Sequence, residues 1–396
     1  MEKRFVYADN AATTPVTPAV LEAMTPWLME NYGNPNSIYS IGRAARTAVE
    51  KARRQVAAAL NAEPGEIYFT SCGTESDNWA VKGSMRRWAA KGKKHLITAV
   101  FEHHAILHSA KALEKEGFEV TYLPVTAEGL VDPAELEKAI REDTALVSIM
   151  LANNEIGTVQ PIARLAAIAH AHGAWFHTDA VQAVGHIPVD VKALGVDMLS
   201  LSGHKFHAPK GVGVLYLRRG TKIKPFMLGG HQESGRRAGT ENVPYIVGLA
   251  KACALATAHM ADEARALAPL RDRLEAGILA ACPNVRVNGD RAHRLPNTPN
   301  VSFEYIEGEA IAYRLSDVGI CISTGSACAS GSLDPSHVIR AMGVPFIAVH
   351  GSVRFSLSRY NTMEEVDYVL EKLPPIIRDL RALSPFGPDR DPTTYK

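Results

Sequence analysis

Two residues of complementary chemistry follow strand-like segments in the middle of the chain. Lys205 follows the segment 198–201, and Asp179 follows the segment 174–177. A lysine amine condenses with an aldehyde, and a carboxylate forms a charge-assisted hydrogen bond to a protonated pyridine nitrogen. Each residue alone would more often be a surface charge or a helix cap. As a pair in neighbouring loops they predict a site for pyridoxal phosphate (PLP), a cofactor that needs both groups.

Polar residues at other strand ends could bind the phosphate and the ring of this cofactor. Residues 70–76 lead from a strand into a helix, and the N–H groups of a helix N-terminus bind anions. The same residues would also form a capping box, so this pattern is weak by itself. The candidate contacts are Gly73, Thr74, Ser202 and His204 for the phosphate, and Gln182, Asn154 and His103 for the ring.

One cysteine differs from the other four in its sequence surroundings. Cys328 lies in the segment 323–332, which has almost no bulky side chain and is typical of an exposed loop. We therefore expect Cys328 to be a reactive nucleophile. The five cysteines form no C-x-x-C pair, which argues against a disulfide framework and a cysteine zinc site. The four expected to be buried, small apolar residues in a reducing compartment are Cys72, Cys253, Cys282 and Cys321.

These residues need a scaffold that brings distant loops together, and the chain predicts one. Short β-rich runs alternate with helical stretches, a pattern that gives βαβ units and a mostly parallel sheet. In such an α/β fold, active groups collect at the carboxyl ends of the strands. The expected strands are 66–70, 95–98, 146–150, 174–177 and 198–201, and the expected helices are 43–60, 104–116 and 162–172.

The pattern changes after about residue 254, which predicts a second domain. The elements expected there are a long helix over 259–281, strands over 300–303 and 352–357, and a closing helix over 363–382. We therefore expect a large cofactor-binding domain and a smaller α+β domain that carries the cysteine loop at about 323–333. The large domain would cover 15–258, and the small one 1–14 and 259–396.

The composition excludes several classes of partner. The 43 basic and 42 acidic residues leave a formal net charge of +1, so the chain has no excess of charge to attract a nucleic acid or an anionic membrane. No run approaches the roughly 20 apolar residues that cross a bilayer. The N-terminal residues have no signal-peptide core. We therefore expect a cytoplasmic protein with no nucleic-acid or membrane partner.

The motifs together closely resemble those of the cysteine desulfurases, which are PLP enzymes of fold type I within the class-V aminotransferases. The similarity runs over nearly the whole chain, from residues 9–14 to the closing helix. It implies a large domain built on a mostly parallel seven-stranded sheet flanked by helices. The matching motifs are 73–77, 153–155, 179–182, 202–205, 237–240, 325–328 and 354–357. The stretches that look most like the nitrogen-fixation branch are 71–74, 204–213, 229–233 and 293–297.

The resemblance implies a role for each cofactor contact. Lys205 would bind PLP and later take the Cα proton of the substrate, while Asp179 would pair with the ring nitrogen. His103 would stack on the ring and move protons; it is chosen over His104 because residues 102–105 match the family pattern Glu-His-x-Ala. The other contacts would be Gly73, Thr74, Ser202 and His204 to the phosphate, Asn154 and Gln182 to the cofactor, and Thr240 from the second subunit of a homodimer.

The implied reaction removes sulfur from L-cysteine. Arg354, with Asn154, would bind the substrate carboxylate, and the thiolate of Cys328 would attack the substrate sulfur, leaving an enzyme persulfide and L-alanine. An iron–sulfur scaffold protein would accept the sulfur, with nitrogenase maturation as the specific version. The resemblance implies no resident metal, although Cys328 could ligate a transferred iron–sulfur cluster.

Other functions remain open on the residues alone. A selenocysteine lyase, or another PLP-dependent lyase or aminotransferase, would keep the PLP site, but a transaminase would not depend on Cys328. A non-catalytic scaffold that keeps the fold would have an eroded site. The lysine, aspartate, histidine, arginine and cysteine of the expected site are all present, which favours the enzyme.

Overall fold

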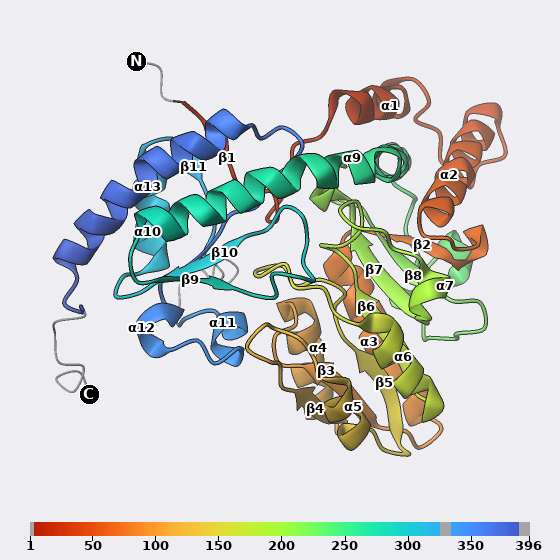
Figure 1. Ribbon diagram of the computed structural model, residues 1–396. Helices are drawn as coiled ribbons and strands as arrows, with labels where there is room; N and C mark the ends of the chain where they lie inside the picture. Colours follow the sequence, from red (N-terminus) through yellow and green to blue (C-terminus); the bar gives the residue numbers. More distant parts are fainter. Residues whose placement is uncertain (1–3, 325–333, 388–396) are drawn as a thin grey trace.

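The computed structural model describes residues 4–324 and 334–387, and its largest element is a seven-stranded sheet (Figure 1). In spatial order the strands are β2 (Ile67–Thr70), β8 (Gly213–Leu217), β7 (Met198–Ser202), β6 (Trp175–Asp179), β5 (Thr144–Ser148), β3 (His95–Ala99) and β4 (Glu119–Leu123). β8 runs antiparallel to β2 and β7, and all other neighbours are parallel. The predicted α/β class with a mostly parallel sheet is therefore confirmed.

Helices cover both faces of this sheet because the strands are apolar on both faces. Successive strand residues alternate between two hydrophobic clusters, so that Leu96 and Ile97, for example, point to opposite faces. The helices on the Leu96 face are α3 (Gly73–Ala89) and α4 (His104–Lys115). Those on the Ile97 face are α1 (Pro18–Met29), α2 (Ser40–Ala59), α5 (Pro133–Ala139), α6 (Ile162–Ala171) and α7 (Val191–Leu194).

The C-terminal part of the chain builds a smaller unit with its own hydrophobic cluster. Its strands are β9 (Val285–Asn288), β10 (Asn300–Phe303), β11 (Ile320–Cys321) and β12 (Ser352–Arg354). Its helices are α10 (Gly308–Asp317) and α13 (Met363–Leu383). The helices α11 (His337–Ala341) and α12 (Phe346–Val349) come from the same part of the chain but bury apolar residues in the cluster on the Ile97 face. β12, β10 and β9 form an antiparallel sheet, and the N-terminal strand β1 (Val6–Tyr7) pairs in parallel with β11.

One helix of 39 residues, α9 (Val243–Ala281), contributes to both parts of the molecule. Leu249 lies in the cluster on the Ile97 face of the large sheet, and Leu274 lies in the cluster of the small unit. Figure 1 shows α9 extending from the region of α1 and α2 to the region of α10 and α13. The sequence predicted a start at residue 259, but the helix starts at Val243, where the side chain of Asn242 accepts a hydrogen bond from the first turn. The expected boundary at 258 therefore falls inside a continuous helix, and the division into two domains stays a prediction.

α9 is also the one helix in the described part of the chain that is long and apolar enough to cross a membrane. The sequence reasoning above expected no such run. Of its most apolar stretch, 44% is buried, and the helix packs against α1, α2 and α13. These contacts are those of a helix in a protein core.

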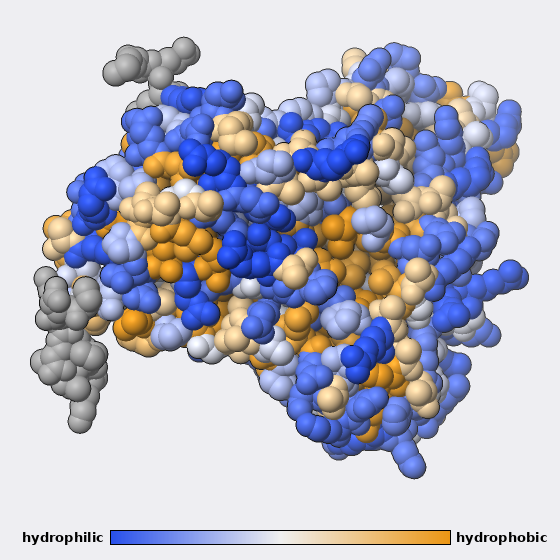
Figure 2. Space-filling model, viewed as in Figure 1, coloured by the Kyte–Doolittle hydropathy of each residue, from blue (hydrophilic) through white to orange (hydrophobic). Residues whose placement is uncertain are grey.

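The surface of the molecule is mostly hydrophilic along its outline, and hydrophobic residues reach it mainly near the middle of the face in Figure 2. Exposed large apolar side chains also occur in the segment that leads from the end of α1 into α2. They are Leu28, Met29, Tyr32, Ile38 and Tyr39, each more than half exposed.

Replacing Leu274 by alanine should destabilise the small unit. Leu274 is 1% exposed, and removing such a buried leucine side chain costs about 2–5 kcal/mol. Leu279 on the same helix is 41% exposed, so Leu279→Ala should change the free energy of unfolding by less than about 1 kcal/mol. Urea unfolding followed by circular dichroism measures both variants, and equal losses would contradict the packing of α9.

Candidate active site

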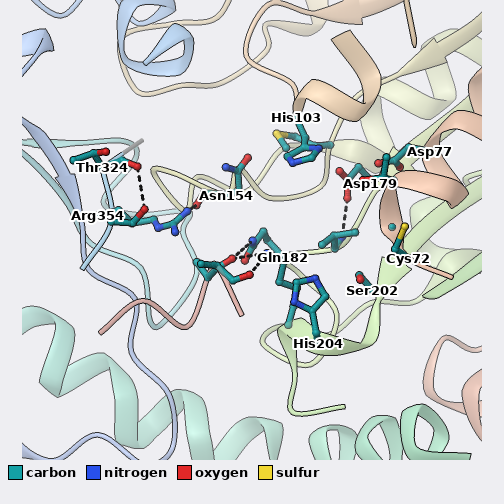
Figure 3. A pocket seen from close by; sticks show the side chains of 18 residues that line it. Cys72, Asp77, His103, Asn154, Asp179, Gln182, Ser202, His204, Thr324 and Arg354 are labelled. Carbon is teal, nitrogen blue, oxygen red and sulfur yellow. Dashed lines mark hydrogen bonds between the residues drawn. The ribbon is translucent and has the colours of Figure 1, made fainter. Parts of the chain in front are cut away.

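A cavity of about 340 Å³ lies where the carboxyl ends of the large sheet face the small unit. This volume is within the range of about 300–1,000 Å³ that is usual for small-molecule sites. Figure 3 shows Arg354 and Thr324 at one end of the cavity, with Asp77, Asp179 and Cys72 at the other. The predicted site residues that line it are Gly73, Thr74, His103, Asn154, Asp179, Gln182, Ser202, His204, Lys205 and Arg354.

Asp179 ends β6 and presents a carboxyl group to one end of the cavity. Its Oδ1 accepts a hydrogen bond of 2.8 Å from the N–H of Val181, and the residue is 5% exposed. Burial raises the pKa of Asp179 to about 6, against the opposing effects of this backbone bond and of Lys205. A buried carboxyl group is stabilised in its charged form by a cation placed against it. The protonated ring nitrogen of PLP is such a cation, so the position fits the predicted pairing.

Lys205 follows β7 at the end of a short 3₁₀ turn, and its amine lies against the N-terminal segment of the chain. The Nζ atom donates hydrogen bonds to the carbonyl oxygens of Ala11 at 2.6 Å and Ala12 at 2.9 Å. Both alanines line the cavity. The amine that would hold the cofactor is therefore positioned by backbone carbonyls from the other end of the sequence.

His103 caps the N-terminus of α4 with its ring. Nδ1 accepts a hydrogen bond of 3.1 Å from the N–H of Ala105, and the neutral ring therefore carries its proton on Nε2. Burial, assisted by the charge of Lys205, lowers the pKa of His103 to about 4. His103 lines the cavity, whereas His104 does not. The neutral imidazole therefore presents its Nε2–H group as a donor near neutral pH.

The residues expected to bind phosphate gather where α3 begins. Gly73 opens this helix, and a Cβ atom at Gly73 would lie 2.7 Å from Cγ2 of Val181, so only glycine allows this approach. The Oγ atom of Ser202 is buried and has no hydrogen-bond partner among the described residues. Thr74 and His204 line the same region. A helix N-terminus beside an unpartnered buried hydroxyl is a suitable site for a phosphate group.

Arg354 ends β12 and reaches across to two other segments. Its Nη1 donates to the carbonyl oxygen of Asn154 at 2.7 Å, and its Nη2 pairs with Oδ1 of Asp9 at 2.8 Å. These two contacts fix the guanidinium group at the cavity wall. Arg354 is 6% exposed, so the group is buried apart from the part that lines the cavity. Asp9 was not predicted as a site residue; it opens the motif 9–14, which was the available signal. The side-chain amide of Gln182 also contacts the segment 9–14, because its Nε2 donates a hydrogen bond of 2.9 Å to the carbonyl oxygen of Ala11.

Two further residues of the cavity wall were missed by the sequence reasoning. Asp77, one turn into α3, is 1% exposed, and burial together with the nearby Asp179 raises its pKa well above the usual range. Cys72 was expected to be buried, but it is partly exposed and lines the cavity. Cys321 is partly exposed as well, whereas Cys253 and Cys282 are buried as expected. The motif 73–77 was the signal that could have identified Asp77.

One predicted contact does not line the cavity, and one predicted residue lies outside the described part of the chain. Thr240 lines a separate depression with Glu233 and Arg237, so it is not brought together with the other phosphate contacts within one chain. Cys328 lies outside the described residues, but Ser323 and Thr324, which precede it, line the cavity. In the described ranges no group of three histidine, cysteine or acidic residues could hold a metal ion.

His177 lies beneath the cavity in the middle of β6. It is fully buried, and its Nδ1 and Nε2 atoms lie 2.9 Å and 3.0 Å from the hydroxyl oxygens of Ser148 and Ser200. Burial lowers the pKa of His177 to about 3. The ring therefore stays neutral in the folded protein between about pH 6.5, where an unfolded histidine gains a proton, and about pH 3.

Comparisons with known proteins agree with this geometry. A family model described as aminotransferase class-V matches residues 6–369. A relative named cysteine desulfurase IscS, from Methanosarcina thermophila, is 57% identical over 387 residues, which cover 98% of this chain and 95% of that protein. Cysteine desulfurase 2 from Trichormus variabilis is 55% identical and covers 97% of this chain and 96% of its own.

Solved structures are similar over most of the chain as well. A NifS-like protein has a TM-score of 0.90 and 44% identity, over 95% of this chain and 100% of that one. A structure described as SspA in complex with cysteine has a TM-score of 0.79 and 38% identity, over 90% of this chain and 100% of that one.

Replacing His177 by glutamine should make stability less sensitive to acid. The unfolded state binds a proton at His177 below about pH 6.5, whereas the folded state does not until about pH 3. Stability from this group is therefore present above pH 6.5 and lost as the pH falls, by about 2 kcal/mol at pH 5. Urea unfolding at pH 7.5 and pH 5 should show the wild type losing more stability than His177→Gln. A parallel loss in both proteins would contradict the neutral buried ring.

Proposed function

This chain belongs to the class-V aminotransferase family, and from that membership we propose how its site works as that of a PLP-dependent cysteine desulfurase. The enzyme removes sulfur from L-cysteine and leaves L-alanine. The observation that carries the proposal is a single cavity lined by Lys205, Asp179 and Arg354. These residues supply the amine, the carboxylate and the guanidinium that the cofactor and an amino-acid substrate require.

PLP, when bound, supplies a ring that accepts the electron pair left when the Cα proton of the substrate is removed. Asp179 would hold the proton on the ring nitrogen, and the burial of this carboxylate would strengthen that interaction. Lys205 would hold the cofactor through its amine and would take the Cα proton of the substrate. Arg354 binds the substrate carboxylate and so fixes the orientation of the Cα–H bond.

Sulfur transfer needs a nucleophile that reaches the substrate, and we assign this role to Cys328. Thr324 lines the cavity, and four residues of chain span at most about 14 Å, so a cysteine at 328 is tethered close to the site. Its thiolate attacks the substrate sulfur: an S–S bond forms, the C–S bond breaks, and the carbon keeps the electron pair, takes a proton and leaves as alanine. We also assign to His103 the movement of substrate protons, with the Nε2–H group of its neutral ring as the donor.

We further propose a homodimer. The apolar side chains exposed between α1 and α2, from Leu28 to Tyr39, support it, because contiguous exposed apolar residues are typical of protein contacts. Thr240, which does not line the cavity of its own chain, would then contact the phosphate in the partner's site.

The sulfur acceptor is an iron–sulfur scaffold protein in this proposal, with nitrogenase maturation as its most specific form. Cys328 would hand over its persulfide and could ligate a transferred cluster. A cytoplasmic location fits a thiol nucleophile that must stay reduced.

Brief exposure of the PLP-loaded enzyme to cysteine should add the mass of one sulfur atom to the peptide that contains Cys328. Mass spectrometry of the digested protein detects this persulfide before a reductant is added. Cys328→Ser should still bind PLP and cysteine, with an unchanged absorbance response, but should release no sulfide. Full sulfide release by this variant would remove the persulfide step, and full conversion of an amino-group acceptor would favour a transaminase.

Arg354→Lys should weaken substrate binding far more than it affects turnover. A lysine amine cannot bind the Asn154 carbonyl, Asp9 and the substrate carboxylate at the same time. The loss of one charged hydrogen bond costs about 1.5–3 kcal/mol, which raises KM by about 10- to 100-fold. Asp9→Asn keeps an oxygen for Nη2 and should raise KM less. Steady-state kinetics with cysteine measures both variants. An unchanged KM in Arg354→Lys would exclude Arg354 from the carboxylate site.

A further inference from the structure

Two side chains at the start of α11 contact the turns that carry site residues. The Oγ atom of Ser336 lies 2.5 Å from Oε2 of Glu155, and Nε2 of His337 lies 2.9 Å from the carbonyl oxygen of Glu102. Glu155 directly follows Asn154, and Glu102 directly precedes His103. The pair Ser336 and His337, which we call the α11 anchor, therefore contacts the strand-end turns after β5 and β3.

Glu155 lies in a turn held from several sides. Its backbone N–H donates a hydrogen bond of 2.8 Å to Oδ1 of Asn153. Its carbonyl oxygen accepts a hydrogen bond of 3.1 Å from the side chain of Asn300 in β10. The residue is 2% exposed, and burial raises its pKa to about 7. A buried carboxyl group is unstable without a hydrogen-bond partner. The hydroxyl of Ser336 supplies one, so the carboxyl position and the α11 anchor stabilise each other.

The turn at Glu102 is held by two bonds in the same way. The carboxyl Oε1 of Glu102 accepts a hydrogen bond of 2.9 Å from the N–H of Met150, and its backbone carbonyl oxygen contacts Nε2 of His337. The carbonyl of Glu102 belongs to the peptide unit that continues into His103. The ring of His337 also packs on His104, with 4.8 Å between ring centroids. Burial lowers the pKa of His337, so a neutral ring with its proton on Nε2 can donate this bond.

The other side of the cysteine segment is also fixed. Ser323 and Arg354 exchange two backbone hydrogen bonds, of 2.7 Å and 3.2 Å. The chain thus enters the segment beside Arg354, and eight residues after Cys328 it reaches the α11 anchor beside Asn154 and His103. The first attachment point is the end of β12 and the second is the pair of strand-end turns, and both carry side chains that would contact the substrate or the cofactor.

We propose that Ser336 and His337 are positioning residues for sulfur transfer, holding the chain that follows Cys328 on the turns of Glu155 and Glu102. The proposal rests on the desulfurase function given above. The α11 anchor contacts neither substrate nor cofactor, so its loss slows the attack of Cys328 and leaves cysteine binding intact. Misplacement of a reacting group by about 1 Å lowers a rate by up to about 100-fold, and loss of one anchor bond should lower it about tenfold.

Matched variants separate this role from a general effect on folding. His337→Phe keeps a ring against His104 but removes the donor, whereas His337→Gln keeps an N–H donor. Glu155→Leu removes the acceptor of Ser336, whereas Glu155→Gln keeps one. Ser336 itself is a poor target, because its hydroxyl also caps α11 by accepting from the N–H of Val338 and Ile339. The control is His108→Phe, since His108 packs on His104 at 5.1 Å without contacting Glu102.

Two steps are measured on each PLP-loaded variant. Cysteine binding is followed by the absorbance change of bound PLP, and persulfide formation on Cys328 is followed in a single turnover by rapid quenching and mass spectrometry. We expect His337→Phe and Glu155→Leu to form the persulfide about tenfold more slowly, with cysteine affinity within about twofold of wild type. The glutamine variants and His108→Phe should stay within about twofold of wild type in both steps.

Hydrogen exchange of the PLP-free proteins gives a second readout. Amides of residues 336–341 should exchange faster in His337→Phe and Glu155→Leu than in the glutamine variants, with the strands of the large sheet unchanged. Persulfide formation at the wild-type rate in His337→Phe and Glu155→Leu would overturn the proposal, as would an equal loss of cysteine binding and transfer in all four variants. Absence of a persulfide in the wild type would instead overturn the desulfurase function.

Discussion

Burial of ionisable groups around one cavity is the constraint on which the rest of the structure depends. Asp77, Glu102 and Asp179 are each at most 5% exposed, and burial raises the pKa of all three carboxyl groups. The same surroundings lower the pKa of His103 and His204. Charges in such a medium are unstable without a partner of opposite sign. A cationic ring bound beside Asp179 therefore gains an interaction that water would weaken, which is how a dry site controls the electronic state of a cofactor.

The fold meets this constraint by surrounding the cavity with segments that are far apart in sequence. The strands of the large sheet end at one edge, which brings Asp179 and Lys205 into neighbouring positions. Arg354 comes from the small unit and is fixed by Asp9 and the Asn154 carbonyl. Because Lys205, Gln182 and Arg354 are each held by partners from distant segments, a change in one of these segments alters the geometry of the others.

The sequence was most informative where one residue type has one chemical use. Strand ends, Lys205, Asp179 and the choice of His103 over His104 all followed from local pattern and motif, and the cavity contains them. Asp9 was missed because its contact with Arg354 spans 345 residues and leaves no local periodicity. The strand β4 was missed as well: its residues Glu119–Leu123 are only partly buried and include a charge and a threonine, so the run is not continuously apolar.

Errors elsewhere came from tertiary contacts that override local composition. Cys72 has the sequence of a small buried residue, yet it caps α3 at the cavity wall, and its neighbour Gly213 approaches it closely: a Cβ atom there would lie 2.7 Å from the carbonyl carbon of Cys72. Gly213 thus makes room for protein backbone, a use that only the packing reveals.

The pairing of the N-terminal segment with the end of the chain has a consequence for biosynthesis. Ala11 and Ala12 hold the amine of Lys205, yet the segment that contains them is secured by β11 and by Ser356, whose N–H donates 2.7 Å to the carbonyl oxygen of Ala8. The ribosome must therefore synthesise nearly the whole polypeptide before its N-terminal segment can form these contacts. Nascent chains and C-terminally truncated products would lack the ordered segment that positions Lys205. Cofactor binding is therefore expected only after synthesis of the chain is nearly complete.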